Sequence, residues 1–144
     1  VKSGETPGDQ ATAKLMKVKA VGIETASVLG YEFFGYRKFK NRRQVGALAG
    51  LTGTPYESGT MKRELGISKA GNPRVRHKMT ETSWLWIRFQ PNSDLTKWYI
   101  ANYGPGCRRN RKAGIVALAR KLLVALWKYI EFDEVPAGAV LKAA

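Results

Sequence analysis

Apolar residues recur every three to four positions along most of the chain, which is the spacing of a helix with one buried face. This spacing predicts two short helices near the start, over about 11–18 and 25–29, joined by a tight turn at 19–23. A further short helix is expected over 42–51, where Asn41 is a good N-cap. No segment shows the alternating pattern of a strand, so the fold is expected to be all-α.

Three longer helices are expected in the second half of the chain, over 73–89, 93–103 and 108–130. The first starts at a proline that follows Asn72, a favourable cap, and it ends before the next proline. The last has the clearest apolar face, formed by Ile115, Leu118, Leu122, Leu126 and Ile130 and widened by Val116, Ala119, Leu123 and Trp127. The pattern therefore predicts a compact helical domain that ends in a long helix.

The domain is expected to span 11–144, a length that suits one hydrophobic core, with 1–10 as a polar linker or disordered end. Residues 52–72 contain four glycines and a proline and are expected to form a long loop, which in a compact domain is usually functional or disordered. No apolar run approaches the roughly 20 residues of a membrane span. A cytoplasmic protein without a membrane partner is therefore expected.

The charge is concentrated in the middle of the chain. Lys and Arg number 25 against 11 Asp and Glu, a net charge of +14, and residues 37–78 alone carry +9 whereas residues 1–36 are neutral. A merely solvated surface does not explain this concentration, which favours a phosphate-backbone partner. One cysteine and one histidine exclude an internal disulfide and a His- or Cys-based zinc site, and the carboxylates suggest no metal cluster.

The segment 15–29 looks like a helix-hairpin-helix unit, in which backbone N–H groups of a tight turn bind a phosphate. The usual turn has two glycines around an apolar residue. Here Ala20 occupies the first position and Gly22 the second. A purely structural helical hairpin is about as consistent with this pattern, so Gly22 is a candidate binding residue and no more.

Two further groups of residues could contact nucleic acid. A basic stretch with interleaved aromatic residues follows the hairpin and supplies Arg37, Lys38, Lys40, Arg42 and Arg43, although a solvated helix entry has the same composition. Around the next helix start lie Lys69, Asn72, Arg74 and Arg76, which could hold phosphate charge. A serine before a glycine can act as a nucleophile on such a loop. The local pattern does not choose Ser58 over Ser68.

The chain from about residue 15 to 142 resembles the C-terminal transposase domain of the insertion-sequence 110 family (the IS 110/116/902 group). The resemblance rests on VGIETASVLGYEFFGYRKFKNRRQVGALAGLTGTPYESG, GISKAGNPRVR and GIVALARKLLVALWKYIEFDEVPAGAVLK, which occur in this order. Members of that family resemble RNA-guided DNA recombinases. The resemblance implies a serine nucleophile at the family's Ser-Gly position, which is Ser58 here, and strand exchange through a phosphoserine link.

The resemblance also implies partners that this chain does not contain. The family has an N-terminal RuvC-like domain with four metal-binding carboxylates, where Mg²⁺ is expected, and the active site is shared between neighbouring protomers of a homo-oligomer. A structured bridge RNA supplies target specificity by base pairing to DNA. Because the RuvC-like domain is absent from this chain, the isolated domain is expected to be inactive. A prokaryotic cytoplasm, in association with the nucleoid, is the expected location.

The sequence departs from the family pattern at two places. Glu57 stands where many relatives have a serine, which puts a negative charge beside Ser58, and Ala20 replaces the hairpin glycine. The alternative interpretation is a non-catalytic module of the helix-hairpin-helix type that binds DNA or RNA, or a domain that assembles protomers.

Overall fold

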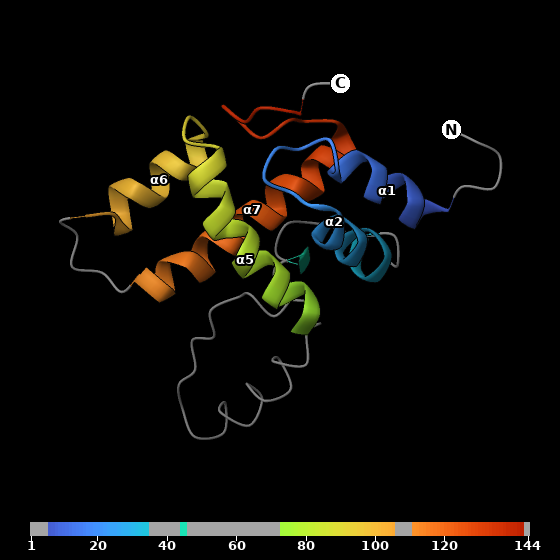
Figure 1. The fold of residues 1–144 in the computed structure, drawn as a ribbon, viewed down its shortest axis with the longest axis horizontal. Coiled ribbons are helices and arrows are strands. Elements are labelled where there is room, and N and C mark those ends of the chain that lie inside the picture. The colour runs from blue at the N-terminus through green and yellow to red at the C-terminus, as the bar shows by residue number, and fades with distance from the viewer. Residues whose placement is uncertain (1–5, 35–43, 46–72, 106–110, 143–144) are drawn as a thin grey trace, which may run out of the picture.

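The computed structural model describes residues 6–34, 44–45, 73–105 and 111–142, and within these residues the fold is helical. The helices are α1 (Pro7–Leu15), α2 (Ile23–Leu29), the π-helix η1 (Gly30–Phe34), α5 (Pro73–Phe89), α6 (Asp94–Tyr103) and α7 (Arg111–Phe132) (Figure 1). In this part of the chain, the strand-like backbone pairing is limited to Val18 with Leu141. The all-α prediction is confirmed.

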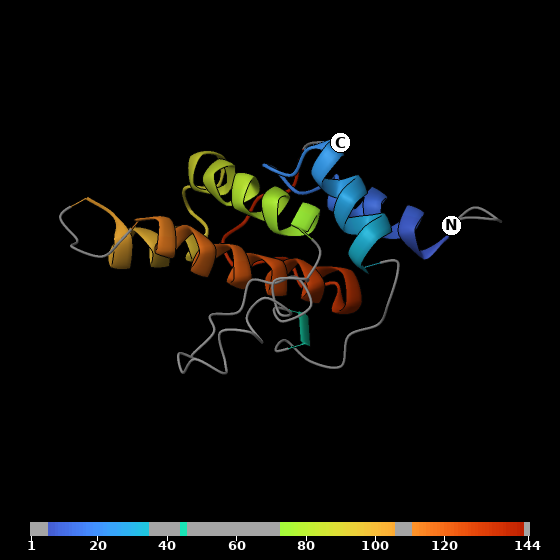
Figure 2. The same ribbon diagram turned by 90° about the horizontal axis from the view of Figure 1, so that it is seen from below.

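Helix α7 is the axis of the fold. Helix α5 packs across it, α6 lies beside its first half, and α1 contacts its last turns (Figures 1 and 2). The predicted stripe of α7 is buried from Ile115 to Leu126, but Val116 was wrongly assigned to it and is 42% exposed. Val116 lies on the side of α7 that none of the described helices covers.

The first helix starts earlier than the apolar spacing indicated. Helix α1 begins at Pro7, where Thr6 accepts a hydrogen bond from the backbone N–H of Asp9 and the Asp9 carboxylate accepts one from the Thr6 N–H. This reciprocal capping box, with proline at the first helical position, stabilises four residues that carry few apolar side chains. The expected linker over 1–10 therefore includes the first turn of a helix.

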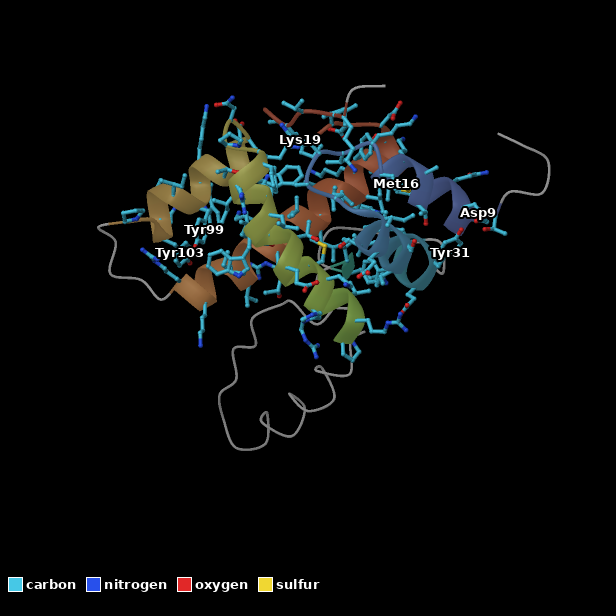
Figure 3. All side chains as sticks on the ribbon, in the orientation of Figure 1. Asp9, Met16, Lys19, Tyr31, Tyr99 and Tyr103 are labelled. Atoms are coloured by element: carbon cyan, nitrogen blue, oxygen red, sulfur yellow. The ribbon has the colours of Figure 1, made fainter. Side chains whose placement is uncertain are left out.

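Helix α1 crosses the α2–η1 segment at very short range. A Cβ atom at Gly30 would lie 2.0 Å from the Thr12 Oγ1 and 2.9 Å from the Thr12 backbone nitrogen. A Cβ atom at Gly8 would lie 2.5 Å from the ring of Tyr31, whose hydroxyl donates to the Asp9 carboxylate (Figure 3). The two glycines thus allow the backbones to approach, and this crossing fixes the angle between the two arms of the hairpin.

The second half follows the sequence prediction closely. Helix α5 spans Pro73–Phe89 as expected, and the Ser93 side chain caps α6 by accepting a hydrogen bond from the Leu95 N–H. Helix α7 is described from Arg111, and the expected start at 108 lies outside the described residues. Most of the short helix expected over 42–51 also lies outside them, as does the loop over 52–72.

The α6–α7 contact is built from aromatic side chains. Tyr99 and Tyr103, one turn apart on α6, stack with ring centroids 5.7 Å apart, and Tyr103 covers Gly114 of α7 (Figure 3). The Trp98 ring lies beneath the Lys121 ammonium at 4.7 Å. Trp98 therefore belongs to a helix–helix interface.

The C-terminal segment after α7 returns to the hairpin. The Lys19 N–H donates to the Val140 carbonyl at 3.3 Å, and the Lys142 N–H donates to the Lys17 carbonyl at 2.7 Å. The side-chain amide of Gln90, just after α5, forms hydrogen bonds with both backbone segments of this contact, at Lys19 and at Val140. Residues more than 100 positions apart are thereby held together around the hairpin turn.

Candidate nucleic-acid interface

Three of the predicted contact residues lie within the described part of the chain: Gly22, Arg74 and Arg76. The others lie outside it, namely Ser58, Arg37, Lys38, Lys40, Arg42, Arg43, Lys69 and Asn72. The geometry of the interface is therefore built from two places, the hairpin turn before α2 and the first turns of α5.

The hairpin turn presents open backbone to solvent. It runs from Met16 to Gly22, which is longer than the predicted 19–23, because α1 already ends at Leu15. Gly22 occupies the N-cap position of α2, where there is no hydrogen bond from the helix to a capping side chain. A Cβ atom placed at Gly22 would meet nothing within 4 Å. The next residue, Ile23, is 64% exposed. The turn thus leaves room for another molecule beside Gly22.

Ala20 occupies a backbone conformation that suits glycine. Its φ angle is +87°, which lies in the left-handed region. Most L-residues are strained there by about 1–2 kcal/mol because Cβ approaches the neighbouring carbonyl oxygen. The strain falls at the position where the sequence pattern expects the first glycine of the turn.

We expect Ala20→Gly to raise the free energy of unfolding by about 0.5–1 kcal/mol, because the relief of strain exceeds the added flexibility of the unfolded chain. Urea unfolding of the 144-residue chain measures this change. The matched control is Ala13→Gly on the exposed side of α1, which should lose about 0.5–1 kcal/mol. Equal losses in the two variants would contradict the strain at Ala20.

Three exposed lysines surround the turn: Lys17, Lys19 and Lys142. Lys142 is brought there by the C-terminal segment, and its Nζ donates to the Val21 carbonyl at 2.9 Å. Figure 3 shows Lys19 beside that segment. Sequence reasoning missed Lys142 because it lies 121 positions from its partner. The hairpin therefore combines open backbone with positive charge, which suits a phosphate backbone.

The start of α5 is tied to the hairpin by two ion pairs. Arg74 lies 3.2 Å from the Glu32 carboxylate of η1, and Lys78 lies 2.9 Å from Glu24 of α2. The hydrogen bond from Lys78 holds the pKa of Glu24 below its usual value. These pairs join the two ends of the segment 35–72, which carries Ser58. The Arg74 side chain is 71% exposed, so a phosphate could replace the Glu32 carboxylate as the ion-pair partner of Arg74.

Two further titratable side chains, one on α5 and one just after α7, have partners within the fold. His77 is a surface residue, with its Nε2 3.4 Å from the Glu81 carboxylate one turn away. Asp133, just after α7, pairs with Lys14 at 2.6 Å, which lowers the Asp133 pKa. Within the described residues, no three His, Cys, Asp or Glu side chains gather as a metal site.

None of the described helices combines the length and the apolar character needed to cross a bilayer.

Comparison with known proteins gives a family. A model described as "Transposase IS116/IS110/IS902 family" matches residues 12–97, which is more than half of the chain. The chain is 48% identical over 134 residues to y4rJ of Sinorhizobium fredii, a protein named as a transposase. The aligned region covers 92% of this chain and 33% of that protein. The chain is 26% identical over 121 residues to the transposase of insertion sequence element IS1328 from Yersinia enterocolitica, covering 83% of this chain and 35% of the relative.

The chain thus spans about a third of the length of the curated relatives that it matches. No solved structure matches it significantly. The family match begins within α1, includes the hairpin, Ser58 and the whole of α5, and ends in α6. The chain belongs to the IS116/IS110/IS902 transposase family.

Proposed function

We propose that this chain is the catalytic-serine domain of a DNA transposase and that Ser58 is the nucleophile. The Ser58 hydroxyl gives up its proton to a base, and its Oγ attacks a backbone phosphorus to form a phosphoserine bond. The bond from phosphorus to the leaving deoxyribose oxygen breaks, and that oxygen takes up a proton. Attack by the hydroxyl of another strand reverses the step and restores the serine. Bond energy is conserved, so strand exchange needs no external energy source.

One observation carries this proposal: the family match extends across the Ser58–Gly59 position and both of its flanks. The net charge of +9 over residues 37–78 supports it, because phosphates must be held around a nucleophile as well as bound. Serine is a weak nucleophile until a base or a charged environment activates it. Activation is assigned to the part of the relatives that this chain does not span, where the resemblance implies a RuvC-like domain.

The positions of the other candidate residues suggest that they bind two different stretches of nucleic-acid backbone. Arg74 follows the segment that carries Ser58 in the sequence and would neutralise a phosphate near the nucleophile. The hairpin turn with Lys17, Lys19 and Lys142 would hold a second stretch of backbone, of DNA or of the guide RNA. The implied Mg²⁺ is assigned to the RuvC-like domain, and within the described residues no three His, Cys, Asp or Glu side chains gather as a metal site.

The proposal is tested in a full-length transposase that carries this domain, by measuring excision of a marked element from a plasmid. Ser58→Ala should reduce excision by about 10³-fold or more while leaving DNA binding within about twofold, because it removes the nucleophile and no phosphate contact. The matched control is Ser68→Ala, which should excise normally. Normal excision by Ser58→Ala would refute the assignment and favour a non-catalytic module that binds nucleic acid through the hairpin.

A further inference from the structure

The outer face of α5 exposes large apolar side chains. Trp84 is 48% exposed, Leu85 41% and Phe89 40%, whereas Met79 and Trp86 on the inner face are fully buried. The inner face packs on α7 and α2, and the outer face lies on the outside of the molecule (Figure 2). Contiguous exposed apolar side chains of this size on one helix commonly mark a binding surface.

Two opposite charges border this apolar centre on the same face. Glu81 precedes Trp84 by three residues, and Arg88 follows Leu85 by three. Seven residues turn a helix to within about 20° of its starting direction, so Glu81 and Arg88 lie above one another, about 10 Å apart. Both are exposed, although Glu81 also contacts Lys78 at 3.4 Å within its own helix. The order of features along α5 is thus negative, apolar, positive.

We propose that this face binds the same face of a second copy, with the two α5 helices antiparallel. A twofold axis between Trp84 and Leu85 brings Glu81 of each copy opposite Arg88 of the other. It also brings the two Trp84 side chains together on one side of the axis and the two Leu85 side chains together on the other. The surface is self-complementary in charge and in apolar character, as a twofold interface requires.

The charge order favours a second copy over an unrelated partner. In a parallel arrangement, like charges would face each other, so the pattern specifies orientation as well as partner. The inference deepens the proposed function, since it gives the expected homo-oligomer a surface. It needs no residue of the Ser58 segment, and its test is separate from the excision assay. Three apolar side chains per copy make a small interface, which predicts a weak dimer.

Sedimentation of the 144-residue chain over a concentration series tests the proposal. We expect reversible, concentration-dependent dimerisation that Leu85→Lys abolishes. The matched control is Val116→Lys, because Val116 is exposed to the same extent on α7 (42% against 41%) and lies on another helix. Loss of dimerisation in both variants, or a chain that stays monomeric at the highest concentration, would overturn the proposal.

A charge exchange separates the antiparallel arrangement from other ways of pairing. Glu81→Arg alone and Arg88→Glu alone each place like charges opposite one another and should weaken the dimer by about tenfold. The double variant Glu81→Arg/Arg88→Glu restores both pairs and should dimerise like the unmodified chain. A double variant weaker than either single one would refute the pairing. Because both side chains are exposed, circular dichroism should show an unchanged fold in all three variants.

Discussion

Replacing Gln90 by leucine is expected to lower the free energy of unfolding by about 3–5 kcal/mol. The Gln90 side chain is 1% exposed, and its Nε2 donates to the carbonyls of Lys19 at 2.8 Å and Val140 at 2.9 Å. Its Oε1 accepts from the Val140 N–H at 2.9 Å. Leucine has a similar volume but leaves all three backbone groups without this partner, and each such group costs about 1–3 kcal/mol when buried.

Urea unfolding of the variant measures this loss, and Gln10→Leu on the exposed side of α1 is the matched control, with an expected change within about 0.5 kcal/mol. Because Gln90 joins the hairpin to the C-terminal segment, the variant should also lose amide exchange protection at Lys19 and Lys142 before the rest of the chain. A loss of less than about 1 kcal/mol would show that Gln90 does not hold this contact.

Two tryptophans on α5 should lose very different amounts of stability when each is replaced by alanine. Trp86 is fully buried between α5 and its neighbours, and its Nε1 donates to the Ser93 Oγ at 3.0 Å. Trp86→Ala should therefore cost about 3–5 kcal/mol, from lost burial and the cavity that remains. Trp84→Ala, two residues earlier and 48% exposed, should cost less than about 1 kcal/mol in the monomer.

Thermal and urea unfolding at low protein concentration, where the proposed dimer is dissociated, compare the two tryptophan variants. The comparison also bears on the dimer, because Trp84→Ala should weaken association at high concentration without unfolding the chain. Similar stability losses for Trp84→Ala and Trp86→Ala would mean that the burial difference along α5 is wrong.

Much of the fold can be predicted from local sequence signals. Helix α5 begins at Pro73, and α6 begins after Ser93 and ends before the Gly104–Pro105 pair. These signals can be found in the sequence because caps and prolines act within one turn of a helix. The buried stripe of α7 follows from its spacing alone. Val116 shows the limit of this reasoning, since an apolar residue beside the stripe is buried only when another element reaches it.

The long-range contacts could not be predicted in this way. Nothing near Gln90 indicates that its amide joins residue 19 to residue 140, and nothing near Lys142 places it at the hairpin turn. Arg74 was predicted as a phosphate contact, but its pairing with Glu32 depends on how η1 packs against the start of α5. The exposure of Trp84 likewise follows from which side of α5 meets α7.

Ser58 lies outside the described residues, and its proposed role as the nucleophile rests on the family match. Its most direct test is to trap the covalent intermediate of a full-length transposase carrying this domain on a suicide DNA substrate, and to map the attached nucleotide by mass spectrometry. We expect a phosphodiester adduct on the peptide that contains Ser58, and no adduct in Ser58→Ala. An adduct on Ser68, on Tyr56 or on any other residue would contradict it.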